Sequence, residues 1–537
     1  MMFVGIILQV IALNKRIVFV YTAIICTFAL LLYRVAWLNT SVYSEAGKGK
    51  SSRTINIGES RGKIYDRYFN QLVEKDEKFL SVVTPVVGAT ADLKKYMTED
   101  EITEKLQKGF PFIIETDEKI NTNFIRTFSV YDRYSENQLA PHIIGYIDKD
   151  KNGISGIEKS FDEFLRKNSG KLSVTFEADR TGRILAGMDK TVNDMNYTSK
   201  AGVVLTLDSE IQRITENALS ESSIKSGCAI VMKAYTGEIL ALSSVPSFDP
   251  DKVAESLEKE NSPLLNKALL AYSPGSVFKP LVAATAIEHG TDPEEIYECK
   301  GEIRVGDRVF SCYNHNAHGK INMTEALEES CNTYFVNLIL NTDTELLMYL
   351  CEKLGIESEI KLASSITASK GTLPDRKEFS KKGVLANFSF GQGELLITPL
   401  KMAQIYSLLA TGNLIEPKLI MGLTNSMGLM TPEKEKSPEK LLSDSTVLTV
   451  RKMLKSVVEK GKADKAYSCL VSLSGKTGTA QSGIYESKKE VLRTWFSGFF
   501  PSDNPNYVVI VMNENGIGGN ADCAPVFKKI CEGIVTR

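Results

Sequence analysis

The pattern of hydrophobic residues shows an uninterrupted run of uncharged residues at 17–33. At about 1.5 Å per residue, this run spans roughly 25 Å as a helix, slightly less than a ~30 Å hydrocarbon core. The helix becomes long enough if it continues to residue 38, with the side chain of Arg34 reaching the interface. The pattern predicts a transmembrane helix at 17–38, preceded by a short cytoplasmic N-terminus at 1–16.

Two other interpretations of this run were weighed. A buried core helix of this length is uncommon. A cleaved signal peptide would use Lys15 and Arg16 as its charged region, but no persuasive small-x-small cleavage site follows the run. We therefore expect an uncleaved anchor. Basic residues flank the run on both sides, so its orientation does not follow from charge.

Beyond the anchor, the pattern changes twice. Residues 39–54 are rich in Ser, Gly and Lys and predict a linker. Residues 55–200 alternate short strand and helix signals, with charged turns between them, and predict a modest α+β pedestal domain. From residue 201 to 537 the elements are longer, and this part is expected to form the main domain.

The main domain shows strand signals at both ends and helix signals between them. Asp208 is a candidate N-cap for an amphipathic helix, and a hairpin surrounds Tyr235-Thr-Gly237. Near the C-terminus the pattern predicts two strands and a closing helix, at 495–500, 507–512 and 524–534. Such an order predicts an antiparallel sheet with helices packed on its faces.

Composition narrows the function without defining it. Of the 537 residues, 43% are hydrophobic and 24% charged, as in globular proteins. The net charge of −2 gives no argument for nucleic acid. The nine cysteines form no Cys-x-x-Cys pair, which argues against a zinc site or a disulfide framework. Cys299 and Cys312 flank a predicted hairpin at 301–310, and a disulfide between them is a hypothesis.

The first of three chemical motifs is Ser276-Val-Phe-Lys279. Its spacing recurs elsewhere, but here Pro274-Gly275 predicts a turn directly before a helix that ends at Gly290. Ser276 would then lie at a helix N-terminus, where developing negative charge is favoured. Lys279 lies one turn further on the same face. Because burial lowers the pKa of a lysine, a neutral Lys279 could take the serine proton.

The second motif, Ser330-Cys-Asn332, follows a predicted helix at 324–329. The hydroxyl of Ser330 could relay a proton between Lys279 and a leaving amine. The amide of Asn332 could hold a substrate amide and orient Lys279. Without the other two motifs, a polar helix surface would be the better interpretation of this triplet.

The third motif is Lys476-Thr-Gly478-Thr479, which fits the edge of a sheet. Gly478 leaves that edge bare, so a peptide could pair with it as an extra strand. Lys476 would supply a fixed positive charge for a substrate carboxylate, and Thr477 a hydrogen bond. The backbone N–H groups of Thr479 and Ser276 could form an oxyanion hole. A phosphate-binding loop is excluded, because its second glycine is missing upstream.

Together these motifs resemble those of the class B penicillin-binding proteins. Further segments that resemble the family are Arg61-Gly-x-Ile-x-Asp-Arg67, Gly156-Ile-Glu158, Leu205-Thr-Leu-Asp-x-x-Ile-Gln212, Val245-Pro-Ser-Phe-Asp-Pro250, Gly391-Gln-Gly393, Thr398-Pro399 and Trp495-Phe-x-Gly498. The resemblance implies an α+β fold, in which an antiparallel five-stranded sheet with helices on both faces stands on a smaller α+β pedestal with one N-terminal transmembrane helix.

The resemblance also assigns roles to residues. It implies that Ser276 is the acylated nucleophile, with further catalytic residues Lys279, Ser330, Asn332 and Thr479 and with substrate-binding residues Lys476, Thr477 and Gly478. No cofactor and no metal are expected. The implied reaction is peptidoglycan D,D-transpeptidation, in which an acyl-enzyme forms with release of D-Ala and β-lactams act as covalent inhibitors.

The implied partners are donor and acceptor stem peptides, β-lactams, the bacterial cell membrane and a membrane glycosyltransferase, but no nucleic acid. The catalytic domain is expected on the extracellular side. Two alternatives stay open: a D,D-carboxypeptidase or β-lactamase-type hydrolase, and a non-enzymatic β-lactam sensor. Division, elongation and sporulation roles are not distinguished.

Overall fold

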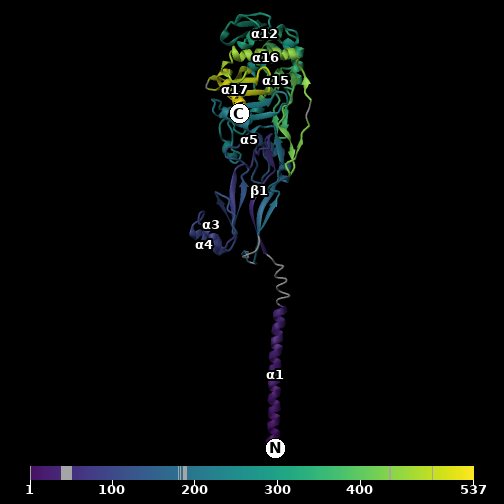
Figure 1. Cartoon of the computed structure of the whole chain (residues 1–537). Helices are drawn as coiled ribbons and strands as arrows, with labels where there is room; N and C mark the ends of the chain where they lie inside the picture. Colours follow the sequence, from purple (N-terminus) through teal and green to yellow (C-terminus); the bar gives the residue numbers. More distant parts are fainter. Residues whose placement is uncertain are drawn as a thin grey trace. The chain divides into compact units, whose positions relative to one another are not determined.

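The structure is a computed structural model of the chain and describes residues 2–37, 51–179, 181, 183–184, 190–434, 437–486 and 488–537. The chain forms two compact units that alternate along the sequence (Figure 1). Unit 1 holds the described residues of Met1–Glu59, Glu77–Val130 and Gly170–Tyr197. Unit 2 holds those of Ser60–Asp76, Tyr131–Ser169 and Thr198–Arg537. Each unit combines segments that are separate in the sequence. The predicted division into a pedestal domain up to residue 200 and a main domain from residue 201 therefore stays a prediction.

The N-terminal helix α1 covers Met2–Trp37. Its part Ile17–Trp37 has a mean hydropathy of 2.0 and is exposed in the structure, and it is long and apolar enough to cross a membrane. The predicted N-terminal segment continues this same helix from its second residue onward. Most of the predicted linker lies outside the described residues, and β1 begins at Ser51, four residues before the predicted domain boundary.

Besides α1, unit 1 contains two small sheets and short helices, and β6 with β7 and β3 with β4 pair antiparallel. One sheet has the order β1-β6-β7 and the other β4-β3-β5. Their strands are β1 (Ser51–Ser60), β3 (Glu77–Val83), β4 (Phe112–Thr116), β5 (Ile125–Tyr131), β6 (Gly170–Ala178) and β7 (Thr191–Met195). Alternate residues of β6 are buried, since successive side chains of a strand point to opposite faces. Helix α4 (Glu99–Lys108) begins at a capping box formed by Thr98 and Glu101.

Unit 2 is built on the predicted antiparallel five-stranded sheet. Its order is β10-β9-β23-β22-β21. The strands are β9 (Gly227–Lys233), β10 (Ile239–Val245), β21 (Ser474–Glu486), β22 (Lys489–Phe500) and β23 (Tyr507–Gly516). Strands β22 and β23 extend beyond the predicted strands, because only their apolar parts carry a hydrophobic pattern.

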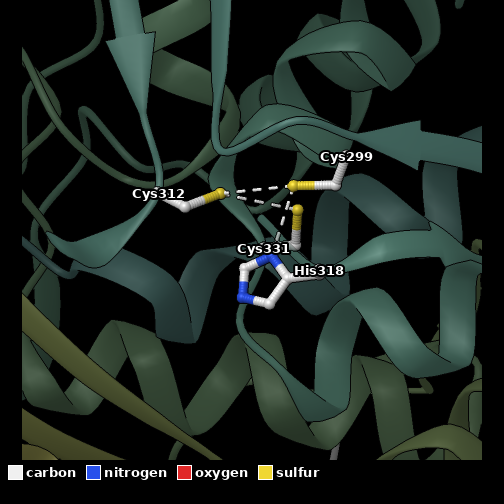
Figure 2. A group of neighbouring side chains, drawn as sticks. All are labelled: Cys299, Cys312, His318 and Cys331. Atoms are coloured by element: carbon white, nitrogen blue, oxygen red, sulfur yellow. Dashed lines mark hydrogen bonds between the residues drawn. The ribbon is translucent and has the colours of Figure 1, made fainter. Parts of the chain in front are cut away.

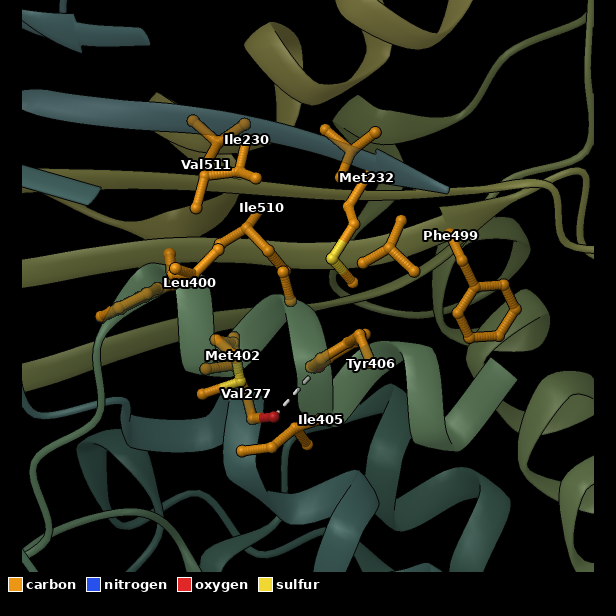
Figure 3. Packing of buried hydrophobic residues seen from close by; sticks show 14 of the residues in the cluster. Ile230, Met232, Val277, Leu400, Met402, Ile405, Tyr406, Phe499, Ile510 and Val511 are labelled. Atoms are coloured by element: carbon orange, nitrogen blue, oxygen red, sulfur yellow. Dashed lines mark hydrogen bonds between the residues drawn. The ribbon is translucent and has the colours of Figure 1, made fainter. Parts of the chain in front are cut away.

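Helices cover this sheet. Helices α8 (Ser209–Ser220) and α17 (Gly519–Val535) pack together, as do α10 (Lys279–Glu288), α15 (Pro399–Thr411) and α16 (Asp444–Glu459). In β22, the ring of Phe496 lies 4.4 Å from that of Phe527 in α17. Phe499, three residues further, points to the other face and belongs to the core beside Tyr406 of α15 (Figure 3). The two groups of helices therefore cover opposite faces.

A buried network of ion pairs joins separate segments of unit 2. The carboxylate of Glu158 is fully buried and lies 2.8 Å from Nε of Arg61. Its other oxygen accepts a hydrogen bond of 2.7 Å from Nε of Arg133. Arg133 also pairs with Glu74 at 2.9 Å. Because one carboxylate neutralises two buried guanidinium groups, its removal would leave uncompensated charge in the interior.

We expect Glu158→Gln to lower the free energy of unfolding by about 3–5 kcal/mol, because it leaves the charges of Arg61 and Arg133 buried without their common partner. Urea unfolding of the full chain, followed through the fluorescence of the buried Trp495, measures this change. The matched control is Glu163→Gln, an exposed position nearby in helix α7 (Asp162–Lys167), which should change stability by less than about 0.5 kcal/mol. Equal midpoints for the two variants would contradict the prediction.

Candidate active site

The first motif forms a tight turn that leads into a helix. Residues Gly275–Phe278 form a 3₁₀ turn, η4, and α10 starts directly after it. Pro280 falls in the first turn of α10, where its missing N–H costs little. The predicted helix end at Gly290 is confirmed, since this residue has a φ of +94°. Ser276 is partly exposed on this turn, whereas Lys279 is fully buried.

The turn is held by hydrogen bonds from three distant segments. The hydroxyl of Tyr406 donates to the carbonyl of Val277 at 3.0 Å (Figure 3). The indole of Trp495 donates to the carbonyl of Ser273 at 3.0 Å. Gly275 donates its N–H to the carbonyl of Gly391 at 2.9 Å. The backbone that carries Ser276 is therefore anchored on both sides of the serine.

The second motif places its serine between two helices, α11 (Met323–Glu328) and α12 (Asn332–Leu340). Ser330 has a φ of +54°, a left-handed conformation that turns the chain sharply. The amine of Lys279 donates to the carbonyl of Ser330 and to Oδ1 of Asn332, both at 2.8 Å. It also lies 3.3 Å from Oγ of Ser330.

The third motif reaches the same hydroxyl. Nζ of Lys476 lies 3.0 Å from Oγ of Ser330 and 3.5 Å from Oγ1 of Thr477. Lys279 of the first motif and Lys476 of the third motif therefore both lie close to the hydroxyl of Ser330, which belongs to the second motif. The structure thus brings together in unit 2 four residues of the three motifs, Lys279, Ser330, Asn332 and Lys476.

Strand β21 also lies directly against the turn that carries Ser276. A methyl group on Gly478 would lie 2.8 Å from the carbonyl oxygen of Pro274 and 2.9 Å from Cγ1 of Val277. β21 is the last strand of its sheet among the described residues, at the predicted edge position, and pairing of a peptide with this edge stays a prediction. Thr479 is exposed and Thr477 partly buried along this edge.

Burial controls the charge of the two lysines. Removal from solvent lowers the pKa of Lys279 to about 7, as the sequence predicts. Removal from solvent, together with the neighbouring Lys279, holds the pKa of Lys476 well below its usual range. Both effects disfavour, in the free site, the fixed positive charge that the sequence analysis expects on Lys476. An anion bound beside Lys476 would favour its charged form again.

The sequence analysis did not identify how this site is held. It named Gly391 and Trp495 only within segments that resemble the family, and it did not name Tyr406, because the role of these residues depends on contacts between remote segments. The proposed disulfide is wrong: Cys299 and Cys312 are free thiols whose sulfurs lie 3.9 Å apart. Cys331, the central residue of the second motif, lies beside them.

A buried amine that can be neutral, on a lysine three residues after a serine in the turn that leads into a helix, is typical of a serine acyltransferase, in which an ester on the hydroxyl carries the acyl group. Comparison with known proteins narrows this class. Residues 227–532 match the family model described as the penicillin binding protein transpeptidase domain. That match covers more than half of the chain. The chain therefore belongs to the penicillin-binding protein transpeptidases, and within them to class B.

Similar proteins agree with this assignment. The chain is 30% identical over 419 residues to the peptidoglycan D,D-transpeptidase FtsI of Buchnera aphidicola subsp. Schizaphis graminum, covering 74% of this chain and 68% of that protein. It is 25% identical over 562 residues to FtsI of Escherichia coli, covering 95% and 90%. The structure of penicillin binding protein 3 from Mycobacterium tuberculosis complexed with ampicillin shares the fold, with a TM-score of 0.66, 24% identity and coverage of 90% and 96%.

We expect Gly478→Ala to slow covalent labelling by a fluorescent penicillin by about tenfold or more, because small displacements of reacting groups cost large factors in rate. The added methyl group would push β21 away from the turn that carries Ser276. Gly518→Ala is the matched control, since its methyl group meets no atom within 4 Å and its φ of 173° suits alanine. Unchanged labelling of Gly478→Ala would show that this contact does not position the serine.

Proposed function

We propose that Ser276 is the nucleophile of peptidoglycan D,D-transpeptidation in this class B penicillin-binding protein, and that Lys279 is its general base. The observation that supports this assignment best is the environment of the Lys279 amine. It is fully buried, its pKa is lowered to about 7, and it donates hydrogen bonds to two acceptors. A neutral amine in this environment is ready to receive a proton.

The hydrogen bonds account for every N–H of a neutral amine. Such an amine has two N–H donors and one lone pair. The carbonyl of Ser330 accepts one of these hydrogen bonds and Oδ1 of Asn332 the other. Asn332 is held in this orientation because its Nδ2 donates to the carbonyl of Ser311 at 3.0 Å. The lone pair of Lys279 is then left to accept a proton from a serine hydroxyl.

In the first step, Oγ of Ser276 attacks the penultimate D-Ala carbonyl of a stem pentapeptide. The Ser276 proton passes to Lys279, and the amide C–N bond breaks as the hydroxyl of Ser330 donates its proton to the leaving D-Ala amine and takes the proton from Lys279 in its place. The backbone N–H groups of Ser276 and Thr479 are the proposed oxyanion hole. Each such donor typically contributes about 100- to 1,000-fold in rate.

In the second step, the amine of a neighbouring stem peptide attacks the ester carbonyl. The ester C–O bond breaks, Oγ of Ser276 recovers a proton, and a new amide cross-links the two stems. Water in place of the amine would give hydrolysis, which is the carboxypeptidase alternative. Both reactions use the same acyl-enzyme and differ only in the acceptor.

Lys476 and Thr477 are proposed to bind the terminal carboxylate of the donor. A carboxylate beside Lys476 would raise its lowered pKa, so the cation would form when the substrate is present. Gly478 would let the stem peptide pair along the open edge of β21. Substrate binding and charge are thus coupled at this lysine.

The location of the substrate suggests the topology. Peptidoglycan lies outside the cytoplasmic membrane, and the chain has an N-terminal helix that can anchor it there. We propose that the catalytic unit lies on the extracellular side and that the partner is a membrane glycosyltransferase that polymerises the glycan strands. The anchor would hold the enzyme close to newly made strands.

We expect Ser276→Ala to abolish the covalent adduct with a fluorescent penicillin in intact-mass analysis, and to abolish cross-linked product from a pentapeptide donor and an amine acceptor. Ser437→Ala is the matched control, because Ser437 is exposed and also stands three residues before a lysine. It should keep both activities. Equal adduct formation by the two variants would refute Ser276 as nucleophile, and a wild type that only hydrolyses the donor would favour the carboxypeptidase alternative.

The rate of acylation should depend on pH through Lys279. Below a pKa of about 7 the amine is protonated and cannot accept the serine proton, so the rate should rise about tenfold per pH unit and then level off. Labelling at subsaturating penicillin between about pH 5 and about pH 9 measures this profile. A rate that stays constant through neutral pH would argue against a neutral lysine base.

A further inference from the structure

A second cluster of reactive side chains lies directly behind the second motif. Figure 2 shows Cys299, Cys312, Cys331 and His318 pointing toward one common centre. Their sulfur and ring nitrogen atoms all lie within 4.8 Å of one another. The three cysteines are buried, with at most 5% of each exposed. Thiols and imidazole gathered in the interior are the ligands that structural zinc sites use.

The distances within the cluster fit a tetrahedral metal site. Bonds of about 2.3 Å to sulfur and about 2.1 Å to nitrogen place tetrahedral ligand atoms roughly 3.6–3.8 Å apart. The sulfur of Cys312 lies 3.9 Å from that of Cys299 and 3.7 Å from that of Cys331. Nδ1 of His318 lies 3.3 Å from the Cys299 sulfur. A disulfide would need sulfurs about 2.05 Å apart.

Groups around the cluster are placed as the outer shell of a metal site requires. The hydroxyl of Thr333 donates to the sulfur of Cys299 at 3.2 Å. The backbone N–H of Tyr334 donates to the sulfur of Cys331 at 3.4 Å. On the far side of the imidazole, Nε2 of His318 lies 3.9 Å from a carboxylate oxygen of Glu329. Donors to thiolates and a carboxylate behind a histidine are recurring features of zinc sites.

We propose that Cys299, Cys312, His318 and Cys331 bind one Zn²⁺ ion. Three thiolates and one neutral imidazole select a soft or borderline metal such as zinc over magnesium or calcium. Binding forms three Zn–S bonds and one Zn–N bond, and the thiol protons pass to water. The sequence analysis argued against zinc because no Cys-x-x-Cys pair occurs. That argument does not hold once folding gathers ligands that lie far apart in the sequence.

The ligands come from a region with little regular structure. Cys299 ends β11 (Tyr297–Cys299), Cys312 follows β13 (Arg308–Ser311) and His318 precedes β14 (Gly319–Ile321). These strands form only two-stranded sheets, β11 with β14 and β13 with β12 (Glu302–Val305). Such small sheets are marginal by themselves, so a metal would hold the loops between them in one arrangement.

The same ion would also position the general base, and this part of the inference rests on the proposed function. Cys331 stands between Ser330 and Asn332, the two residues that accept the hydrogen bonds of Lys279. On the other side, Cys312 follows Ser311, whose carbonyl holds the amide of Asn332. Two of the four ligands are therefore bonded directly to residues that orient Lys279 or its partner.

Elemental analysis of the full-length chain, purified in detergent without chelators, tests the site. We expect about one zinc per chain in the wild type, and a zinc content that is lower by about tenfold or more in Cys299→Ser. His318→Cys should retain zinc, since four thiolates also form a tetrahedral site. The matched control Cys469→Ser removes an exposed cysteine outside the cluster and should leave the zinc content unchanged.

A second measurement does not depend on the folding of a variant. Wild-type chain stripped of metal and supplied with Co²⁺ should show the visible absorption of tetrahedral cobalt bound by thiolates. The proposed site would be overturned if the purified chain contained no zinc and the cobalt-treated chain showed no such absorption. A disulfide between any two of the three cysteines in the purified chain would overturn it as well.

The link to catalysis is tested separately. Metal removal from the wild type should slow penicillin acylation by about tenfold or more, and added Zn²⁺ should restore it. Equal acylation with and without metal would refute the positioning role. Ser276→Ala should still bind one zinc, so failure of the nucleophile assignment and failure of the metal site give different results.

Discussion

The site depends on one desolvated amine. Lys279 can be neutral near pH 7 only because the core of unit 2 excludes water from it, and it can be held there only because two acceptors meet its two N–H groups. One acceptor, Ser330, lies in the turn between α11 and α12, the other, Asn332, starts α12, and the lysine starts α10. Packing of these helices therefore excludes water from Lys279 and holds its pKa at about 7, and a loosened core would return that pKa toward its usual range.

Much of this arrangement can be predicted from local sequence. The turn before Ser276, the end of α10 at Gly290, the hairpin of β9 and β10 and the edge position of Gly478 all follow from short-range preferences of proline, glycine and alternating apolar residues. The predicted bounds are too short where the hydrophobic pattern is weak. This applies to the polar ends of β22 and β23 and to the start of α17, which begins at Gly519 rather than near residue 524. No apolar periodicity marks these residues.

Contacts between segments that are distant in the sequence cannot be predicted from local sequence. The hydrogen bond from Tyr406 to Val277 joins residues 129 positions apart. The sulfur of Cys299 and the hydroxyl of Thr333 lie 34 positions apart and meet only through loops of irregular shape. The lowered pKa of Lys476 likewise has no signature in its own motif, since it depends on burial and on a second lysine. Three-dimensional proximity, rather than residue type, decides these features.

The edge position of β21 has a consequence beyond the proposed substrate binding. An unpaired strand edge is a template on which any extended chain can add, and this is a common route to self-association and aggregation. The five-stranded sheet ends in β21 on one side and in β10 on the other. Lys476 of β21 is fully buried and burial disfavours its charge, so this lysine does not provide the charged guard that edge strands often carry. The peptide pairing proposed for β21 would therefore also cover an edge that the strand itself leaves unguarded.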